Sequence, residues 1–145
     1  MNFEKYTQNA RQAVVDAQSL AVQNGQQEID GEHLHLALMQ QRDGLIPKLV
    51  KNMGADPGQI IRELEDALGR LPKVSGSAQN AYFSRRAEKL LNDAEKETKN
   101  FRDDYTSVEH LYLALLGEKR TPSAEIFGRH GITKQKFLEE LTKVR

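Results

Sequence analysis

Two glutamate–histidine pairs are the residues of this chain whose types could do chemistry. Glu32 precedes His33, and Glu109 precedes His110. A carboxylate beside an imidazole could serve general acid–base catalysis, but a histidine without an oriented partner rarely makes a catalytic site. We therefore expect the histidines to be structural, bonded to backbone or solvent. For each glutamate two interpretations stay open, helix capping and ligand binding.

Other motifs of catalysis or cofactor binding are absent from the sequence. His33 and His35 are two residues apart, so on a helix they face different directions and cannot share a metal ion. Neither Gly-x-x-x-x-Gly-Lys-Ser/Thr nor Gly-x-Gly-x-x-Gly occurs, and there is no His-Glu-x-x-His. The chain also has no cysteine, which fits a reducing compartment. We expect no enzymatic activity, no metal and no cofactor in this domain.

The two pairs belong to an internal repeat with a constant offset of 77 residues. The block from Glu32 to Leu38 returns as Glu109 to Leu115, and Gly54 aligns with Gly131. Two copies of one unit predict a pseudo-twofold domain with a seam, where a groove could lie. The expected organisation is a single domain over 1–145, with one unit at about 3–70, a linker at about 71–79 and a second unit at about 80–145.

Helical periodicity dominates both units, and each is expected to form four helices, eight in all. Thr7 can cap the first helix, and Gly25 can close it in a left-handed turn. In the second unit, either Thr106 or Ser107 could cap the second helix, and Thr106 with Glu109 would form a capping box. No segment shows sustained alternation of apolar and polar residues, so we expect no sheet and an all-α fold.

The third and fourth helices of each unit have clear expected ends. The third helices are expected at about Ile46–Met53 and Pro122–His130, each stopped by a glycine. The fourth helices are expected to restart at Asp56-Pro57 and at Thr133, and to end near Leu71 and Val144. A Pro and a Gly-Ser turn between residues 71 and 77 are expected to separate the units.

Charge and hydropathy exclude several classes of protein. Lys plus Arg and Asp plus Glu both total 21, so there is no basic excess for nucleic acid or a membrane surface. No apolar run approaches the ~18 residues that span a bilayer, and the N-terminus is polar. We expect a soluble cytoplasmic protein.

Three local patterns carry further expectations. The basic cluster of Arg85, Arg86 and Lys89 is expected to be a solvated helix face, because Glu88 and Glu95 dilute it. Leu90 and Leu91 are adjacent, so one of them could line the seam. Asp103-Asp104 could be ordinary loop solvation or, with Glu109, an acidic rim.

The doubled Glu-His-Leu-x-Leu-Ala-Leu block in a repeated four-helix unit resembles the N-terminal domain of the Clp family of AAA+ unfoldases. The resemblance covers essentially the whole chain. Two further segments, Asp16–Ala21 and Leu68–Val74, are most similar to ClpB-type disaggregating chaperones. The resemblance implies a mobile, monomeric appendage of a hexameric ring, which captures unfolded or aggregated polypeptide. ATP and Mg²⁺ are implied only for ATPase modules of the parent protein.

The resemblance also implies which residues bind substrate. Substrate contacts of ClpB-like domains correspond here to Thr7, Asp103 and Glu109, with Leu91 in a nearby apolar groove. His110 stands where some ClpB domains have leucine, and would make that wall more polar. Glu32, together with Glu109, keeps an alternative open, because ClpC uses glutamates at these places to recognise phosphorylated arginine. The alternative function is therefore docking of an adaptor, or recognition of such a tag, as in ClpA and ClpC.

Overall fold

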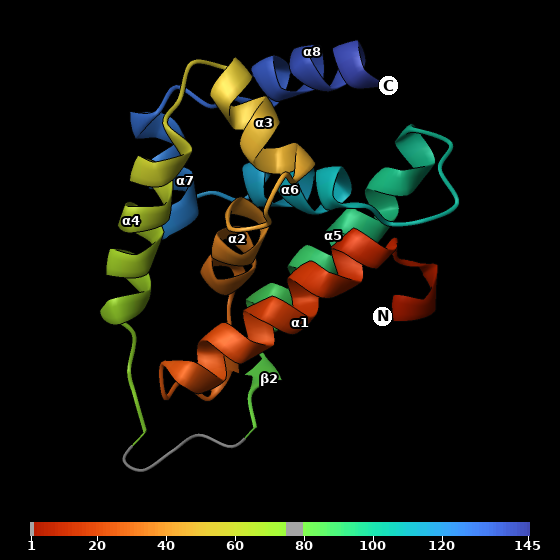
Figure 1. The fold of residues 1–145 in the computed structure, drawn as a ribbon. Helices are drawn as coiled ribbons and strands as arrows, with labels where there is room; N and C mark the ends of the chain where they lie inside the picture. The colour runs from red at the N-terminus through yellow and green to blue at the C-terminus, as the bar shows by residue number, and fades with distance from the viewer. Residues whose placement is uncertain (1, 75–79) are drawn as a thin grey trace.

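The computed structural model describes residues 2–74 and 80–145, and these residues form a mostly helical domain (Figure 1). A 3-10 turn at Phe3–Lys5 precedes the first helix. The helices of the first unit are α1 (Gln8–Gln23), α2 (Gly31–Met39), α3 (Leu45–Asn52) and α4 (Pro57–Gly69). Those of the second are α5 (Arg85–Asn100), α6 (Val108–Leu116), α7 (Pro122–Arg129) and α8 (Lys134–Val144). The eight expected helices are thus confirmed, while the Gly-Ser turn at 75–77 lies outside the described residues.

Short polar residues and glycines set the ends of these helices. A Ser, Thr or Asp stands at the N-cap of every described helix except α3, which follows Gly44. Thr7 caps α1 as expected, since its hydroxyl accepts a bond from the amide of Ala10. Gly54 and Gly131 follow the third helices with φ of 88° and 67°, a left-handed conformation that costs a glycine little.

The capping boxes use histidine, which corrects the expected pairing of Thr106 with Glu109. The N-cap of α6 is Ser107, one residue later, so the third helical position belongs to His110. The Ser107 amide donates to Nδ1 of His110 at 2.9 Å, and in α2 the Asp30 amide donates to Nδ1 of His33 at 2.9 Å. The imidazoles therefore fill the role that a glutamate side chain usually has. Both glutamates are left out of the capping.

Two short strands correct the expectation of no sheet. β1 (Glu28–Ile29) and β2 (Tyr82–Phe83) pair in parallel, and an isolated parallel bridge joins Tyr6 to Thr106. Strands of two residues are too short to leave an alternation of polar and apolar residues in the sequence. The pairings Ile29–Phe83 and Thr106–Tyr6 are related by the repeat. The segment before the first helix of each unit therefore pairs its backbone with the other unit. The two units are interlocked rather than placed end to end.

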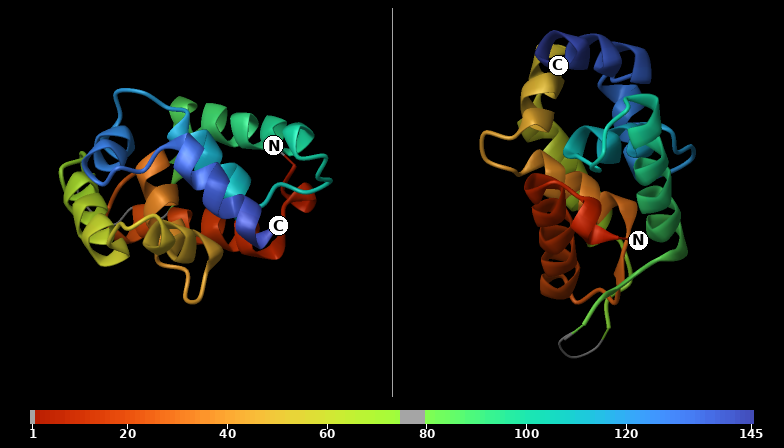
Figure 2. Two further views of the ribbon diagram at one scale, coloured as in Figure 1. Left: turned by 90° about the horizontal axis from the view of Figure 1, so that it is seen from above. Right: turned by 90° about the vertical axis from the view of Figure 1, so that its right-hand side faces the viewer.

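The pseudo-twofold axis passes between His35 and Tyr112. These residues are repeat partners, yet their side chains touch, with Nε2 of the histidine 3.3 Å from the tyrosine hydroxyl. Residues related by a twofold axis can contact each other only close to that axis. Both are fully buried, and α2 and α6, which carry them, form the centre of the molecule (Figure 2).

The fourth helices break the symmetry. α4 packs along α2, whereas its counterpart α8 touches α6 at few positions. In the first unit the Gln26 side-chain amide donates to the Leu68 carbonyl at 2.7 Å and ties down the end of α4. The repeat places Asp103 at the position of Gln26, and a carboxylate has no proton to give to a carbonyl. The end of α8 is instead joined to Asp103 by the side chain of Arg145, whose Nη2 donates to Oδ2 of Asp103.

Candidate binding site

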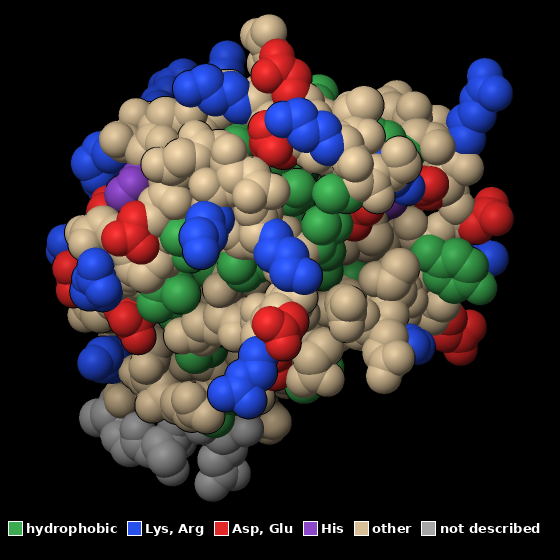
Figure 3. Space-filling view, turned by 45° about the horizontal axis from the view of Figure 1, so that its top comes forward, with side chains coloured by type: hydrophobic (Ala, Val, Ile, Leu, Met, Phe, Trp, Pro, Cys, Tyr) green, Lys and Arg blue, Asp and Glu red, His purple; other side chains and the backbone are tan. Residues whose placement is uncertain are grey.

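Three residues implied as substrate contacts line one open pocket. Thr7 at the start of α1, Asp103 in the α5–α6 loop and Glu109 in the first turn of α6 share it with Leu45 and Arg145. Its lining residues come from the starts of α1, α3 and α6, from the α5–α6 loop and from the end of α8. On the face that turns α8 and α3 toward the viewer, apolar side chains gather near the middle and charged ones surround them (Figure 3).

Asp103 organises the polar side of this pocket. Its Oδ2 lies 2.9 Å from Nε2 of His110 and 2.5 Å from Nη2 of Arg145. Partial burial alone would raise the pKa of Asp103, but the hydrogen bond and charge of Arg145, with His110, outweigh it and lower that pKa. Burial lowers the pKa of His110 despite the nearby Glu109 and Asp103 carboxylates, so this histidine tends to be neutral. The negative charge at Asp103 is thus well stabilised.

Glu109 is nearly enclosed but poorly partnered. It is only 8 % exposed. Among the described residues no donor makes a hydrogen bond to its carboxylate, and the closest cation is Nε of Arg145, 3.8 Å from Oε2. None of the buried side-chain oxygens among the described residues lacks a hydrogen-bond partner, so the Glu109 carboxylate oxygens reach solvent in the open pocket. Glu109 is therefore the group in the pocket with the most unused capacity to accept hydrogen bonds.

An apolar hollow adjoins the polar pocket on the other side of Arg145. Phe101, Leu138 and Leu141 line it, with the stem of Arg145 as the common wall. The Arg145 guanidinium carbon lies 5.0 Å from the centroid of the Phe101 ring, a cation–π distance. The poor packing of α8 against α6 leaves this hollow open.

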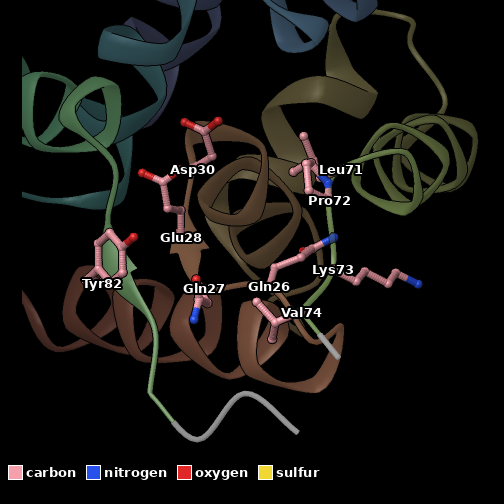
Figure 4. A pocket seen from close by; sticks show the side chains of 9 residues that line it. All are labelled: Gln26, Gln27, Glu28, Asp30, Leu71, Pro72, Lys73, Val74 and Tyr82. Carbon is pink, nitrogen blue, oxygen red and sulfur yellow. The ribbon is translucent and has the colours of Figure 1, made fainter. Parts of the chain in front are cut away.

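The first unit carries the repeat-related counterpart of the polar pocket (Figure 4). Gln26, Gln27, Glu28 and Asp30 line it, at the positions of Asp103, Asp104, Tyr105 and Ser107. The segment from Leu71 to Val74, which resembles the ClpB linker, runs along one wall. The two pockets therefore share one repeat-related wall, which carries different side chains in each unit.

The Glu32 carboxylate lies in a buried ion cluster with Arg86, which corrects the expectation that Arg86 is solvated. Glu32 is 2 % exposed and accepts hydrogen bonds from Nη1 and Nη2 of Arg86 at 2.9 and 2.6 Å. The backbone amide of Ser123 is a third donor, and Glu118 binds the other edge of the guanidinium. Burial works to raise the pKa of Glu32, but the Arg86 interactions prevail and lower it.

The remaining expected site residues, His110 and Leu91, are buried. His110 is fully buried beneath the pocket, and Leu91 is 1 % exposed between α1 and α5. Leu91 lines a small apolar cavity with Val14 and Phe83, apart from the residues around Glu109. Its neighbour Leu90 is equally buried, so neither leucine lies open at the seam. The structure thus brings Thr7, Asp103 and Glu109 together, with His110 below them, and leaves Glu32 and Leu91 in separate places.

Residues 5–130 match the family described as the Clp repeat (R) N-terminal domain. The chain belongs to this family. Curated relatives of the Clp N-terminal domain include the chaperone protein ClpB of Clostridium perfringens, which is 38 % identical over 149 residues, and that of Nitratidesulfovibrio vulgaris, 37 % identical over 152. Each match covers the whole of this chain and 17 % of the relative.

Solved Clp N-terminal domains share the fold. The Hsp104 N-terminal domain from Candida albicans superimposes with a TM-score of 0.84 at 23 % identity, over 97 % of this chain and 91 % of the other. The N-domain of ClpV from Vibrio cholerae gives 0.81 at 16 % identity, over 98 % and 86 %. A further match, with a TM-score of 0.73 at 16 % identity over 95 % and 89 %, is a complex of a ClpV N-domain with a VipB peptide.

Arg86 and Arg145 are the site residues that sequence reasoning missed. Each lies beside a repeat-related glutamate, but only the folded chain brings them there, from 54 and 36 positions away in sequence. In the part of the chain that the structure describes, no group of three or more His, Cys, Asp or Glu side chains could hold a metal ion. None of the described helices combines the length and apolar character needed to cross a bilayer.

Proposed function

We propose that this Clp N-terminal domain binds unfolded segments of polypeptide for a ClpB-like disaggregating chaperone. The observation that carries the proposal is the joint lining of one open pocket by Thr7, Asp103 and Glu109. These residues come from segments about 100 positions apart, and the resemblance implies all three as substrate contacts. The hexameric ring, the ATPase activity and the need for ATP and Mg²⁺ belong to the proposed parent protein.

The shape and charge of the site support capture of an extended segment. The hollow of Phe101, Leu138 and Leu141 can bury an apolar side chain, while Asp103 and Glu109 can bind polar groups beside it. Ordering a flexible segment offsets much of the contact energy, so we expect weak binding by one domain. Several copies in one assembly would strengthen that binding by multivalency.

The test is an NMR titration of the isotope-labelled domain with an unfolded model polypeptide. Shifts should cluster at Thr7, Asp103 and Glu109, and the variant Glu109→Gln should weaken binding. The exposed Glu139→Gln on α8 is the matched control and should bind normally. No shifts, or equal effects of both variants, would refute the proposal.

The alternative, docking of an adaptor or an arginine-phosphorylated tag, rests on the presence of both Glu32 and Glu109. The same titration repeated with phosphoarginine distinguishes it. Strong shifts at both glutamates with phosphoarginine, and none with the polypeptide, would favour the alternative. Nη2 of Arg86 already lies 2.6 Å from Oε2 of Glu32. We therefore favour the binding of unfolded polypeptide over the recognition of a tag.

A further inference from the structure

The first unit holds an extended segment of its own chain in its pocket. Residues 71–74 follow α4 and run along one wall of this pocket, beside residues 26–30 (Figure 4). The backbone amide of Val74 donates a hydrogen bond to the carbonyl of Gly25 at 2.9 Å. The first and last residues of the segment are half-buried, and the two between them are exposed. The segment is therefore held by a main-chain bond and by apolar side chains at its first and fourth positions.

The carbonyl that accepts this bond has a counterpart in the second unit. The repeat places Arg102 at the position of Gly25, and both residues are left-handed, with φ of 56° and 70°. Their backbone amides, and those of the residues that follow them, bond to carbonyls at repeat-related positions of the preceding helix. The same helix-ending turn thus forms in both units and directs the two carbonyls alike.

Main-chain groups along the corresponding wall of the second unit are free to bind. Among the described residues, no backbone group bonds to the Arg102 carbonyl, or to the N–H and C=O groups of Tyr105. Tyr105 lines the pocket that also contains Asp103 and Glu109, and the described lining residues include no counterpart of residues 71–74. A wall with unpaired main-chain groups is a template for pairing with another chain.

The side chain at position 102 leaves room for such a chain. If Gly25 carried a Cβ, it would lie 3.9 Å from Cβ of Lys73 and 4.0 Å from the carbonyl oxygen of Val74. Both are ordinary van der Waals distances, so a segment that followed the path of residues 71–74 in the second unit would not collide with Cβ of Arg102. The rest of that side chain can stay in solvent, because Arg102 is exposed.

We propose that the Glu109 pocket binds an extended polypeptide segment by its main chain, with a backbone N–H of the segment donating to the Arg102 carbonyl. The inference rests on the proposed function and gives it a binding mode. Every residue except proline can donate this bond, so the site accepts many sequences. Apolar side chains of the segment enter the adjoining apolar hollow.

The test uses a peptide copied from the first unit. This blocked hexapeptide, Gly-Ala-Leu-Pro-Lys-Val, repeats residues 69–74 with alanine in place of Arg70 and carries a fluorophore. Fluorescence anisotropy measures its affinity for the domain, and NMR of the isotope-labelled domain locates it. Binding should shift the Arg102 carbonyl carbon and the Asp103 amide nitrogen, because these atoms belong to the peptide group that accepts the bond.

N-methylation distinguishes main-chain from side-chain binding. A hexapeptide with N-methylvaline cannot donate the bond and should bind about two- to tenfold more weakly, the effect of one hydrogen bond. N-methyllysine is the matched control and should bind like the parent peptide, because the Lys73 amide makes no backbone bond in the first unit. In the protein, Arg102→Gly keeps both the carbonyl and the left-handed turn, so it should bind the parent peptide normally.

The outcomes separate this inference from the proposed function. Equal affinities of the two N-methylated peptides, loss of binding in Arg102→Gly, or binding of unfolded polypeptide but not of the hexapeptide would each refute main-chain recognition, while polypeptide capture stands. If neither ligand binds, the proposed function fails and the inference fails with it. Shifts at Arg102 and Asp103 that only N-methylvaline removes would support the proposal.

Discussion

At the scale of the residue, removal of the Arg86 side chain should lower the stability of the fold. Arg86→Ala would leave Glu32, 2 % exposed, with a buried negative charge and only the Ser123 amide as donor. Unpairing a buried charge costs about 3–5 kcal/mol, and we expect about 2–3 kcal/mol here because Arg86 is 29 % exposed. Urea unfolding followed by circular dichroism measures the loss.

Two further variants make this prediction specific. Arg85→Ala removes a neighbouring but exposed arginine and should change the free energy of unfolding by less than about 0.5 kcal/mol. The double variant Arg86→Ala/Glu32→Gln should recover part of the loss, because a neutral amide is less costly to bury than a carboxylate. Equal, small effects of Arg86→Ala and Arg85→Ala would contradict the role of the ion cluster.

A second residue-scale prediction concerns acid sensitivity. Burial lowers the pKa of His35 to about 3, far below its unfolded value of about 6.5. Between these values the unfolded chain binds one more proton at this residue than the folded chain does. Stability should therefore fall as the pH drops below about 6.5, by at most about 1.4 kcal/mol per pH unit from this histidine.

The measurement is the free energy of unfolding at several pH values between 7.5 and 5, a range chosen to lie above most carboxylate titrations. His33 and His110 add to the slope, since burial lowers the pKa of both. The variant His35→Gln keeps a polar group near Ser123 and should reduce the proton uptake on unfolding by about one near pH 5. An unchanged uptake would mean that His35 is not a neutral buried group.

At the scale of the element, the helix ends allow a matched test with two glycines. Gly54 has φ of 88° and Gly69 is the last residue of α4, and an added Cβ would meet nothing within 4 Å at either. Gly54→Ala should cost about 1–2 kcal/mol because of its left-handed backbone. Gly69→Ala should instead stabilise by up to about 1 kcal/mol, since alanine favours helix. Thermal unfolding compares them, and equal shifts would argue against the left-handed turn.

How far the sequence predicts these elements depends on whether the deciding interaction is local. Thr7, Gly25, Gly54 and Gly131 mark helix ends through bonds to their own neighbours, and those predictions are confirmed. The sequence left Thr106 and Ser107 both open as the cap of α6; the structure has Ser107, and only the capping box of Thr106 with Glu109 was wrong. Thr106 instead pairs its backbone with Lys5 and Thr7, and such long-range pairing leaves no local pattern.

The same distinction applies to the candidate site. The repeat, read from the sequence, predicts that Glu32 and Glu109 have equivalent places, and the fold confirms that equivalence. It does not predict that Arg86 neutralises one of them, because a basic residue on a helix with acidic neighbours is usually solvated. Only the folded structure shows that Arg86 bonds to Glu32, whereas the Glu109 carboxylate accepts no hydrogen bond from a described residue.

At the scale of the whole molecule, the broken symmetry between α4 and α8 should appear in hydrogen exchange. The buried Gln26 side chain holds the end of α4 at Leu68, and α4 packs along α2, whereas α8 touches α6 at few positions and its end is held by a part-exposed ion pair between Arg145 and Asp103. Helices with few tertiary contacts open at low free energy. Amide exchange measured by mass spectrometry should therefore be faster in α8 than in α4.

Ligand binding gives this last prediction its functional meaning. A polypeptide bound between α6 and α8 would contact Leu138 and Leu141, and would supply the packing that α8 lacks. Saturating peptide should slow exchange in α8 and leave α4 unchanged, because anything that binds the closed form raises the cost of opening. Glu109→Gln should weaken that protection. Exchange in α8 as slow as in α4 before peptide is added would mean that the groove is not held open by weak packing.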